Sequence, residues 1–352
     1  MDRFIGIDAH TQSCTLAVVD VKGKHLRTDV VETNGQALVE YLRLIPGQRH
    51  LCLEEGTQSQ WLFEILSPHV HDLTVVWAEK KRGNKNDALD ALGLAERMRT
   101  GCLGRRIFKA PESFTELRAL ARAYDMITRD VVRTKNRIKG AYRSRGVLVT
   151  GKQAVYAPES RQQFIDQLPS QTRLVVDMLC RELDGQAAIK AEAQKAMITA
   201  ACKHGAFRIV KTAPGLGPVR AAQVLAVVVT PQRFRTSRQF WAYCGLAIVM
   251  RSSSDWAQQP SGAWARSAVQ QTCGLNRNHN HVAKAVFKAA ATTVISQLRD
   301  GPLYADYERL LSAGTKPNLA KLTIARKIAA MTLAMWKNKE AYEPAKHRKP
   351  TA

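Results

Sequence analysis

Short apolar runs and amphipathic stretches alternate along the first hundred residues. The runs RFIGID and CTLAVVD have the residue types of strands, and the turn-like Lys22-Gly23-Lys24 separates the second run from a third. Asn34 is placed to cap one helix, and the stretch NKNDALDA opens another. The pattern predicts the order βββαβαβα, with strands near 3–8, 14–20, 25–32, 50–54 and 73–77, and helices near 35–45, 58–67 and from 87 onward.

This order describes a strand meander that continues into a partly parallel sheet flanked by helices. It is the plan of an RNase H-like α/β domain, although other α/β folds share it. We therefore predict an α/β domain of this class over residues 1–108.

The periodicity becomes helical after Pro111. Apolar residues at 117, 120, 124, 127, 131 and 138 form a heptad seam, which predicts one long helix. A polar stretch at 146–162 interrupts the pattern, and a second helix with a weaker seam is predicted at about 170–203. An antiparallel hairpin, an oligomerising coiled coil and packing against the chain's own domain all fit, so we assign 109–204 to a helical coiled-coil or linker region.

The third region begins with a glycine-rich turn before an apolar helical run, RAAQVLAVV. The pattern Pro-Gly-x-Gly before such a helix resembles a helix-hairpin-helix turn, whose free N–H groups can hold a DNA phosphate, and an ordinary loop and cap fits equally. In the first interpretation Gly215, Gly217, Lys211 and Arg220 would contact nucleic acid. We predict a mainly α C-terminal domain over 205–345 and a basic tail over 346–352.

The composition limits the classes of molecule that the protein is expected to bind. The 352-residue chain has 53 lysines and arginines against 30 aspartates and glutamates, a net charge of +23, which favours nucleic acid over a membrane surface. Its seven cysteines are widely spaced and contain no Cys-x-x-Cys pair, which is typical of reduced thiols. No apolar run reaches the length of a membrane span, and the start MDRFIGID lacks a signal peptide, so we expect a cytoplasmic protein.

Acidic residues stand at the ends of predicted strands and at the start of a helix. Asp8 ends the first strand, Glu54 and Glu55 end the fourth, and Asp87 and Asp90 share a helix face. Adjacent residues of a strand face opposite sides, so only one of the two glutamates can join Asp8. Four carboxylates would repel one another unless Mg²⁺ or Mn²⁺ neutralised them, and two such ions support phosphodiester chemistry. The alternative is that Asn86 or Asp87 caps the helix.

These residues resemble the insertion-sequence one-ten transposases, also called DEDD transposases, a family that includes the Piv DNA invertase and bridge-RNA-guided recombinases. The resemblance spans most of the chain and rests on FIGID, LEEGTQSQW, NKNDALDALGLAE and the run from APGLGPVRAAQVLA through RFRTSRQFWAYCGL. It implies a RuvC-like N-terminal domain and a C-terminal transposase domain that carries a catalytic serine.

The resemblance also assigns residues. Matching Thr57 and Trp61 selects Glu55 as the metal ligand, whereas matching the apolar residues ahead of it selects Glu54, and we prefer Glu55. Counting from the Gly-Leu pair at 245–246 places the family's serine at Ser253, with Ser252 and Ser254 as alternatives. The segment that follows departs from the family's Gly/Ser/Lys-rich pattern and is longer.

The implied reaction is attack of the serine on a DNA phosphodiester, which leaves a phosphoserine link and a free 3′ hydroxyl that later reverses the attack. The resemblance further implies a nucleoid-associated enzyme that binds donor and target DNA and a noncoding bridge RNA, and that acts as a dimer to tetramer in which the metal site and the serine meet across protomers. Two alternatives stay open: a RuvC-like nuclease that hydrolyses branched DNA with water, and a non-enzymatic nucleic-acid-binding scaffold.

Overall fold

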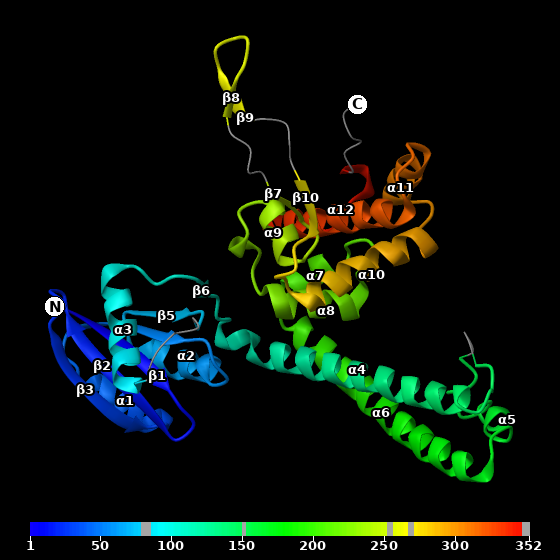
Figure 1. Ribbon diagram of the computed structural model, residues 1–352, viewed down its shortest axis with the longest axis horizontal. Helices are drawn as coiled ribbons and strands as arrows, with labels where there is room; N and C mark the ends of the chain where they lie inside the picture. Colours follow the sequence, from blue (N-terminus) through cyan, green and yellow to red (C-terminus); the bar gives the residue numbers. More distant parts are fainter. Residues whose placement is uncertain (79–85, 150–152, 252–255, 267–270, 347–352) are drawn as a thin grey trace. The chain divides into compact units, whose positions relative to one another are not determined.

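The protein divides into two compact units, Met1–Ser113 and Phe114–Ala352. The computed structural model describes residues 1–78, 86–149, 153–251, 256–266 and 271–346 (Figure 1). Among these residues no helix is both long enough and apolar enough to cross a membrane.

The first unit is a mixed six-stranded sheet with helices on both faces. The predicted order βββαβαβα is present, and a two-residue strand that the pattern did not predict is added at one edge. The elements are β1 (Asp2–Ala9), β2 (Ser13–Asp20), β3 (His25–Glu32), α1 (Gly35–Arg43), β4 (Gln48–Glu54), α2 (Ser59–Leu66), the 3-10 turn η1 (Ser67–His69), β5 (Asp72–Val76), α3 (Asp87–Thr100) and β6 (Arg106–Ile107).

The strands lie in the order β3-β2-β1-β4-β5-β6. The meander β1–β2–β3 is antiparallel, β4 and β5 run parallel to β1, and β6 closes the edge antiparallel to β5. The carboxyl ends of β1, β4 and β5 therefore lie at one edge of the sheet, where side chains from neighbouring strands can converge.

The two faces of this sheet pack against different helices. Ile5, Ile7, Leu51 and Leu53 share a core with residues of α1 and α2. The alternate positions face α3, and Cys52 and the last residue of β5 pack there with Leu94 and Met98. This alternation follows from the two-residue period of a strand, and it decides below which acidic side chain can reach which face.

The second unit begins with a long helical hairpin. α4 (Thr115–Arg143) packs against α6 (Ser170–Cys202), and the short α5 (Gln162–Ile165) lies between them in sequence. Most of the predicted seam on α4 is buried within the chain, and Leu120 and Ile127 are half-buried. Leu117 and Tyr124 join the large C-terminal core, while Val131 and Ile138 pack with residues of α6.

The rest of the second unit is mainly helical, as predicted. The helices α8 (Gly217–Val228), α10 (His281–Gln297) and α12 (Pro317–Asn338) contribute most of its largest core, which also takes in the adjoining ends of α4 and α6. The short turn η2 (Glu112–Phe114) lies at the boundary between the two units. The remaining elements of the second unit are α7 (Ala206–Val210), η3 (Pro231–Arg233), α9 (Ser237–Tyr243), β7 (Ile248–Arg251), β8 (Trp256–Gln258), β9 (Trp264–Arg266), β10 (Gln271–Leu275), α11 (Pro302–Ser312) and η4 (Pro344–Lys346).

The sequence pattern did not predict the four short strands of the second unit. They form two antiparallel pairs, β7 with β10 and β8 with β9. The β8–β9 pair is a hairpin, drawn in yellow in Figure 1.

Candidate active site

Helix α3 lies against β1 at a residue that has no side chain. A Cβ built on Gly6 would stand 1.9 Å from the carbonyl oxygen of Ala91 and 2.6 Å from the amide nitrogen of Ala95. Only glycine permits this approach. The contact places the first turn of α3, one turn before Ala91, beside the end of β1, and so brings Asp87 towards Asp8.

The first turn of α3 is capped by Asn86, not by Asp87. The Asn86 side chain accepts hydrogen bonds from the backbone N–H groups of Ala88, at 3.0 Å, and Leu89, at 3.4 Å. Asp87 is the first helical residue, and its carboxylate is not used for capping. Capping by Asn86 therefore leaves the Asp87 carboxylate available for another role.

Asp8 and Asp87 converge on a histidine. His10 Nε2 is 3.4 Å from a carboxylate oxygen of Asp8 and 3.4 Å from one of Asp87. The ligand atoms of the three residues lie within 4.8 Å of one another, a spacing that would let them share an ion. Sequence reasoning missed His10 because it searched for carboxylates. The signal was its position two residues after Asp8, on the loop that follows the strand.

Glu54 lies on the face of the sheet that carries Asp8 and α3. In the parallel pairing of β1 and β4, Ile7 is in register with Leu53, so Asp8 and Glu54 occupy the next positions of their strands. Glu54 is itself in register with Val76, which packs in the core beneath α3. Residues in register share a face, so Glu54 stands beside Asp8.

Glu55 is directed into a different network. Its carboxylate is 2.5 Å from Lys109 Nζ and accepts a hydrogen bond from Ser59 Oγ at 3.0 Å. Lys109 also donates to Ser59 Oγ at 2.6 Å, and only 5% of its side chain is exposed. A charged group buried this deeply needs a partner, which makes the Glu55 contact costly to lose. The network ties the residue after β4 to the start of α2.

The donor set fits a hard divalent cation. Asp8 and Asp87 offer carboxylate oxygens, which Mg²⁺ and Mn²⁺ prefer, and His10 offers a ring nitrogen. Asp90 lies in the same first turn of α3 as Asp87, but neither Asp90 nor Glu54 belongs to this cluster of ligand atoms among the described residues. The buried thiols of this sheet are poor competitors, because burial raises the pKa of Cys14 and raises that of Cys52 to about 12, so both stay protonated.

The predicted serine nucleophile falls outside the described residues. Ser252, Ser253 and Ser254 follow β7 directly in the sequence, and β8 begins two residues after the last of them. The described flanks are the pairing of β7 with β10 and the β8–β9 hairpin.

The glycine-rich turn before α8 has contacts within the protein. Gly215 has a φ of +74°, and a Cβ there would lie 2.4 Å from the Ala290 carbonyl oxygen, so this glycine seats the turn on α10. The Arg220 guanidinium donates to Gly215 O at 2.5 Å and to Thr293 Oγ1 at 2.9 Å. Lys211 lies over the Phe207 ring, with Nζ 5.8 Å from its centroid. Nucleic-acid contact by Gly215, Gly217, Lys211 and Arg220 stays a prediction.

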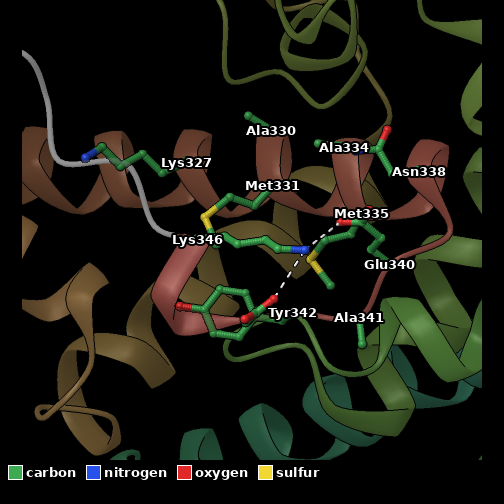
Figure 2. A pocket seen from close by; sticks show the side chains of 11 residues that line it. Lys327, Ala330, Met331, Ala334, Met335, Asn338, Glu340, Ala341, Tyr342 and Lys346 are labelled. Atoms are coloured by element: carbon green, nitrogen blue, oxygen red, sulfur yellow. Dashed lines mark hydrogen bonds and ion pairs between the residues drawn. The ribbon is translucent and has the colours of Figure 1, made fainter.

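A cavity of about 450 Å³ lies elsewhere in the second unit, between α12 and the segment after it (Figure 2). Met331, Met335 and Tyr342 line it, and Lys346 closes one side by pairing with Glu340 at 3.1 Å and Glu343 at 3.2 Å. Its apolar lining differs from the carboxylate cluster, and none of the predicted site residues contributes to it.

Two matches to protein-family models, which together cover well over half of the chain, establish the family of this protein. Residues 5–144 match the DEDD transposase model of the IS110 group, which spans the sheet, Asp8, Asp87 and α4. Residues 207–307 match the transposase model of the IS116/IS110/IS902 family. The chain belongs to the IS110 family of transposases. No individually curated protein gave a match. Membership implies an enzyme that cleaves and rejoins DNA, and therefore DNA substrates.

Proposed function

We propose that this IS110-family transposase cuts and rejoins DNA with a metal-dependent site formed by Asp8, Glu54, Asp87 and Asp90. The observation that carries the proposal is the convergence of Asp8 and Asp87, which come from distant parts of the sequence, at the carboxyl edge of the sheet. The mixed sheet with this edge supports an RNase H-like, RuvC-like fold for the first unit. Mg²⁺ or Mn²⁺ would supply charge neutralisation and polarise the scissile phosphate.

In this proposal Glu54 replaces Glu55, which the family resemblance had favoured. The support is the strand register, which puts Glu54 beside Asp8, and the engagement of Glu55 with Lys109. Lys109 and Ser59 then act as positioning residues, because they fix the backbone that aims Glu54 at the site. His10, between Asp8 and Asp87, is the group best placed to orient both carboxylates.

The chemistry that we propose on the DNA is a transesterification by Ser253, with Ser252 and Ser254 as alternatives. The serine oxygen forms a bond to phosphorus, and the bond from phosphorus to the 3′ oxygen breaks, so the 3′ oxygen leaves as a hydroxyl. A 3′ hydroxyl then attacks the phosphoserine and releases the serine. Bond energy is conserved through both steps, and serine needs activation by a base or metal. Pairing of a bridge RNA with both DNA partners, and an oligomer that joins the two sites, belong to the same proposal.

The first experiment separates catalysis from folding. Asp87→Asn should reduce strand cleavage in Mg²⁺ or Mn²⁺ by at least about a thousandfold, an effect of about 4 kcal/mol on the barrier. Because Asn86 supplies the cap, the same change should alter the free energy of unfolding by less than about 1 kcal/mol. Asp72→Asn, an acid at the opposite end of β5, is the matched control and should cleave normally. Normal cleavage by Asp87→Asn, at the rate of Asp72→Asn, would exclude the proposed metal site.

Metal binding can be measured without the reaction. Mn²⁺ should raise the melting temperature of the unmodified protein, and Asp8→Asn should remove that shift. Retention of the full shift in Asp8→Asn would place the cation elsewhere. A protein whose DNA rearrangement survived both Asp8→Asn and Asp87→Asn would be a nucleic-acid-binding scaffold that depends on another enzyme.

The serine step has its own readout, a covalent adduct between protein and DNA. The adduct should form with Ser252→Ala and Ser254→Ala and disappear with Ser253→Ala, as judged by gel shift after denaturation. Loss with a neighbouring serine would reassign the nucleophile. Cleavage that persisted in all three variants without any adduct would support the hydrolytic RuvC-like nuclease.

A further inference from the structure

The β8–β9 hairpin displays two exposed tryptophans on one face. Trp256 is 56% exposed and Trp264 is 63% exposed. In the antiparallel register Trp256 stands opposite Arg266, and Gln258 stands opposite Trp264. Opposite residues share a face, and so do residues two apart along a strand, so both rings project from the same side of the ribbon. Neither tryptophan belongs to a hydrophobic core cluster among the described residues.

The hairpin is a defined turn structure. Gly262 N–H donates to Gln259 O at 2.8 Å, and Gln259 N–H donates to Ala263 O at 2.9 Å. Pro260 occupies the second turn position, where its fixed φ is suited, and Gly262, at the fourth position, has the positive φ of +81° with which the chain enters the returning strand. The turn therefore specifies the register, and the register holds the two indole rings as neighbours on a diagonal.

The charge of the surrounding sequence indicates which class of molecule the two tryptophans contact. Between residues 193 and 299 there are 14 lysines and arginines and a single acidic residue, Asp255. Trp256 to Arg299 contains no aspartate or glutamate at all. Surfaces that pair large aromatic residues with unbalanced positive charge are suited to nucleic acid, because the rings stack on bases while the cations neutralise phosphates.

We propose that the Trp256–Trp264 face stacks on unpaired bases of the DNA that the transposase recombines. Strand exchange exposes such bases, and every base has a flat face, so the contact requires no particular sequence. The hairpin begins at Trp256, three residues after the predicted nucleophile Ser253 in the sequence, which would hold an unpaired strand close to the point of attack. The inference rests on the family's DNA substrate and needs neither the metal site nor the serine.

Equilibrium binding to two DNAs tests it. One DNA is a fully paired duplex and the other is a duplex of equal length with a central unpaired stretch, each labelled for fluorescence anisotropy without divalent cation. Trp256→Ala with Trp264→Ala should raise the Kd for the unpaired DNA about tenfold or more and that for the paired DNA less than about twofold. Gln258→Ala, on the same face, is the matched control and should change neither value beyond about twofold.

Phenylalanine variants distinguish stacking from folding. Trp256→Phe with Trp264→Phe should keep the affinity within about threefold, because the ring still stacks. It should also remove the part of the tryptophan fluorescence quenching that unpaired DNA causes in the unmodified protein. An unchanged quench would show that the bases lie elsewhere and would overturn the proposal.

Three other results would also overturn it. Equal loss of affinity for both DNAs would indicate a structural or purely electrostatic role. A loss seen with single-stranded RNA but not with single-stranded DNA would assign the face to RNA. A change of particle mass in light scattering for the alanine variant, with DNA affinities retained, would assign it to contact between protein copies.

Discussion

The two units of the chain contain equal numbers of acidic residues and very unequal numbers of basic ones. Residues 1–113 contain 15 acidic and 15 basic residues, whereas residues 114–352 contain 15 acidic and 38 basic ones, so the whole excess of 23 lies in the second unit. The difference separates two tasks. The first unit gathers carboxylates at a sheet edge, and the second has the charge to hold a polyanion. Substitutions in the first unit should therefore impair DNA cleavage, and substitutions in the second unit should impair DNA binding.

The largest effect is expected from Gly6→Ala in the first unit. The added Cβ would overlap the Ala91 carbonyl, so α3 must move, and we expect the free energy of unfolding to fall by about 3 kcal/mol. Cleavage should be lost as Asp87 leaves Asp8. Calorimetry and cleavage assays measure both effects. Gly93→Ala in α3 itself, where a Cβ meets nothing within 4 Å, is the control and should stabilise the helix by about 0.5–1 kcal/mol.

Substitutions of the two glutamates at the end of β4 should affect different properties, cleavage for one and stability for the other. Glu54→Gln should reduce cleavage at least about a hundredfold with little change in stability, because it removes a metal oxygen. Glu55→Gln should instead lower the free energy of unfolding by about 1–3 kcal/mol, because buried Lys109 loses its charged partner. Denaturant titration and cleavage rates provide the comparison. A stable Glu55→Gln protein without cleavage would restore Glu55 as the ligand.

Binding should respond to charge in the second unit. Lys288→Gln, at an exposed position of α10, should weaken DNA binding and flatten the dependence of log K on log salt by up to about 0.9. Lys24→Gln, at an exposed position of the first unit, is the matched control and should leave the slope unchanged. Anisotropy titrations over a series of salt concentrations measure both. A similar change in the two variants would contradict the division of tasks.

The smallest effect concerns pH and the base of the helical hairpin. The His204 ring stacks on Phe114 with centroids 4.0 Å apart, and burial lowers the pKa of His204 below its usual 6.5. The unfolded chain therefore binds the proton more tightly, so stability is present above about pH 6.5 and is lost as the pH falls. His204→Gln should remove this small part of the acid sensitivity in melts between pH 8 and pH 5. An identical pH profile in His204→Gln and the unmodified protein would exclude a contribution of His204 to the acid sensitivity.

Much of the first unit could be predicted because its strands are short, continuous apolar runs bounded by turn residues. RFIGID and CTLAVVD place apolar residues on both sides of a buried sheet, and Asn34 and Asn86 are helix caps in the structure as in the sequence pattern. β6 was missed because two residues, Arg106 and Ile107, carry no periodicity. The choice between Glu54 and Glu55 depends on the direction of Lys109, which is 54 residues away in sequence, and no local pattern contains it.

The second unit was predicted less completely, for a different physical reason. Its helices carry apolar periodicity, but β8 and β9 are three residues each, and their tryptophans are exposed rather than buried. The hydrophobic pattern of a sequence predicts an element mainly through the residues that it buries. A short strand whose apolar residues are exposed to solvent is therefore not predicted. His10 was missed for a related reason, since a single exposed histidine has no pattern of its own.

The contact between Gly6 and α3 has a consequence for the mutational robustness of the enzyme. A glycine codon can change to another amino acid at either of its first two bases, and every product adds at least one carbon where the Ala91 carbonyl already stands. We therefore expect nearly any coding change at position 6 to inactivate the protein, although Gly6 offers no side chain to a substrate or a metal. A transposase gene that escapes selection should lose its function there as readily as at the carboxylates themselves.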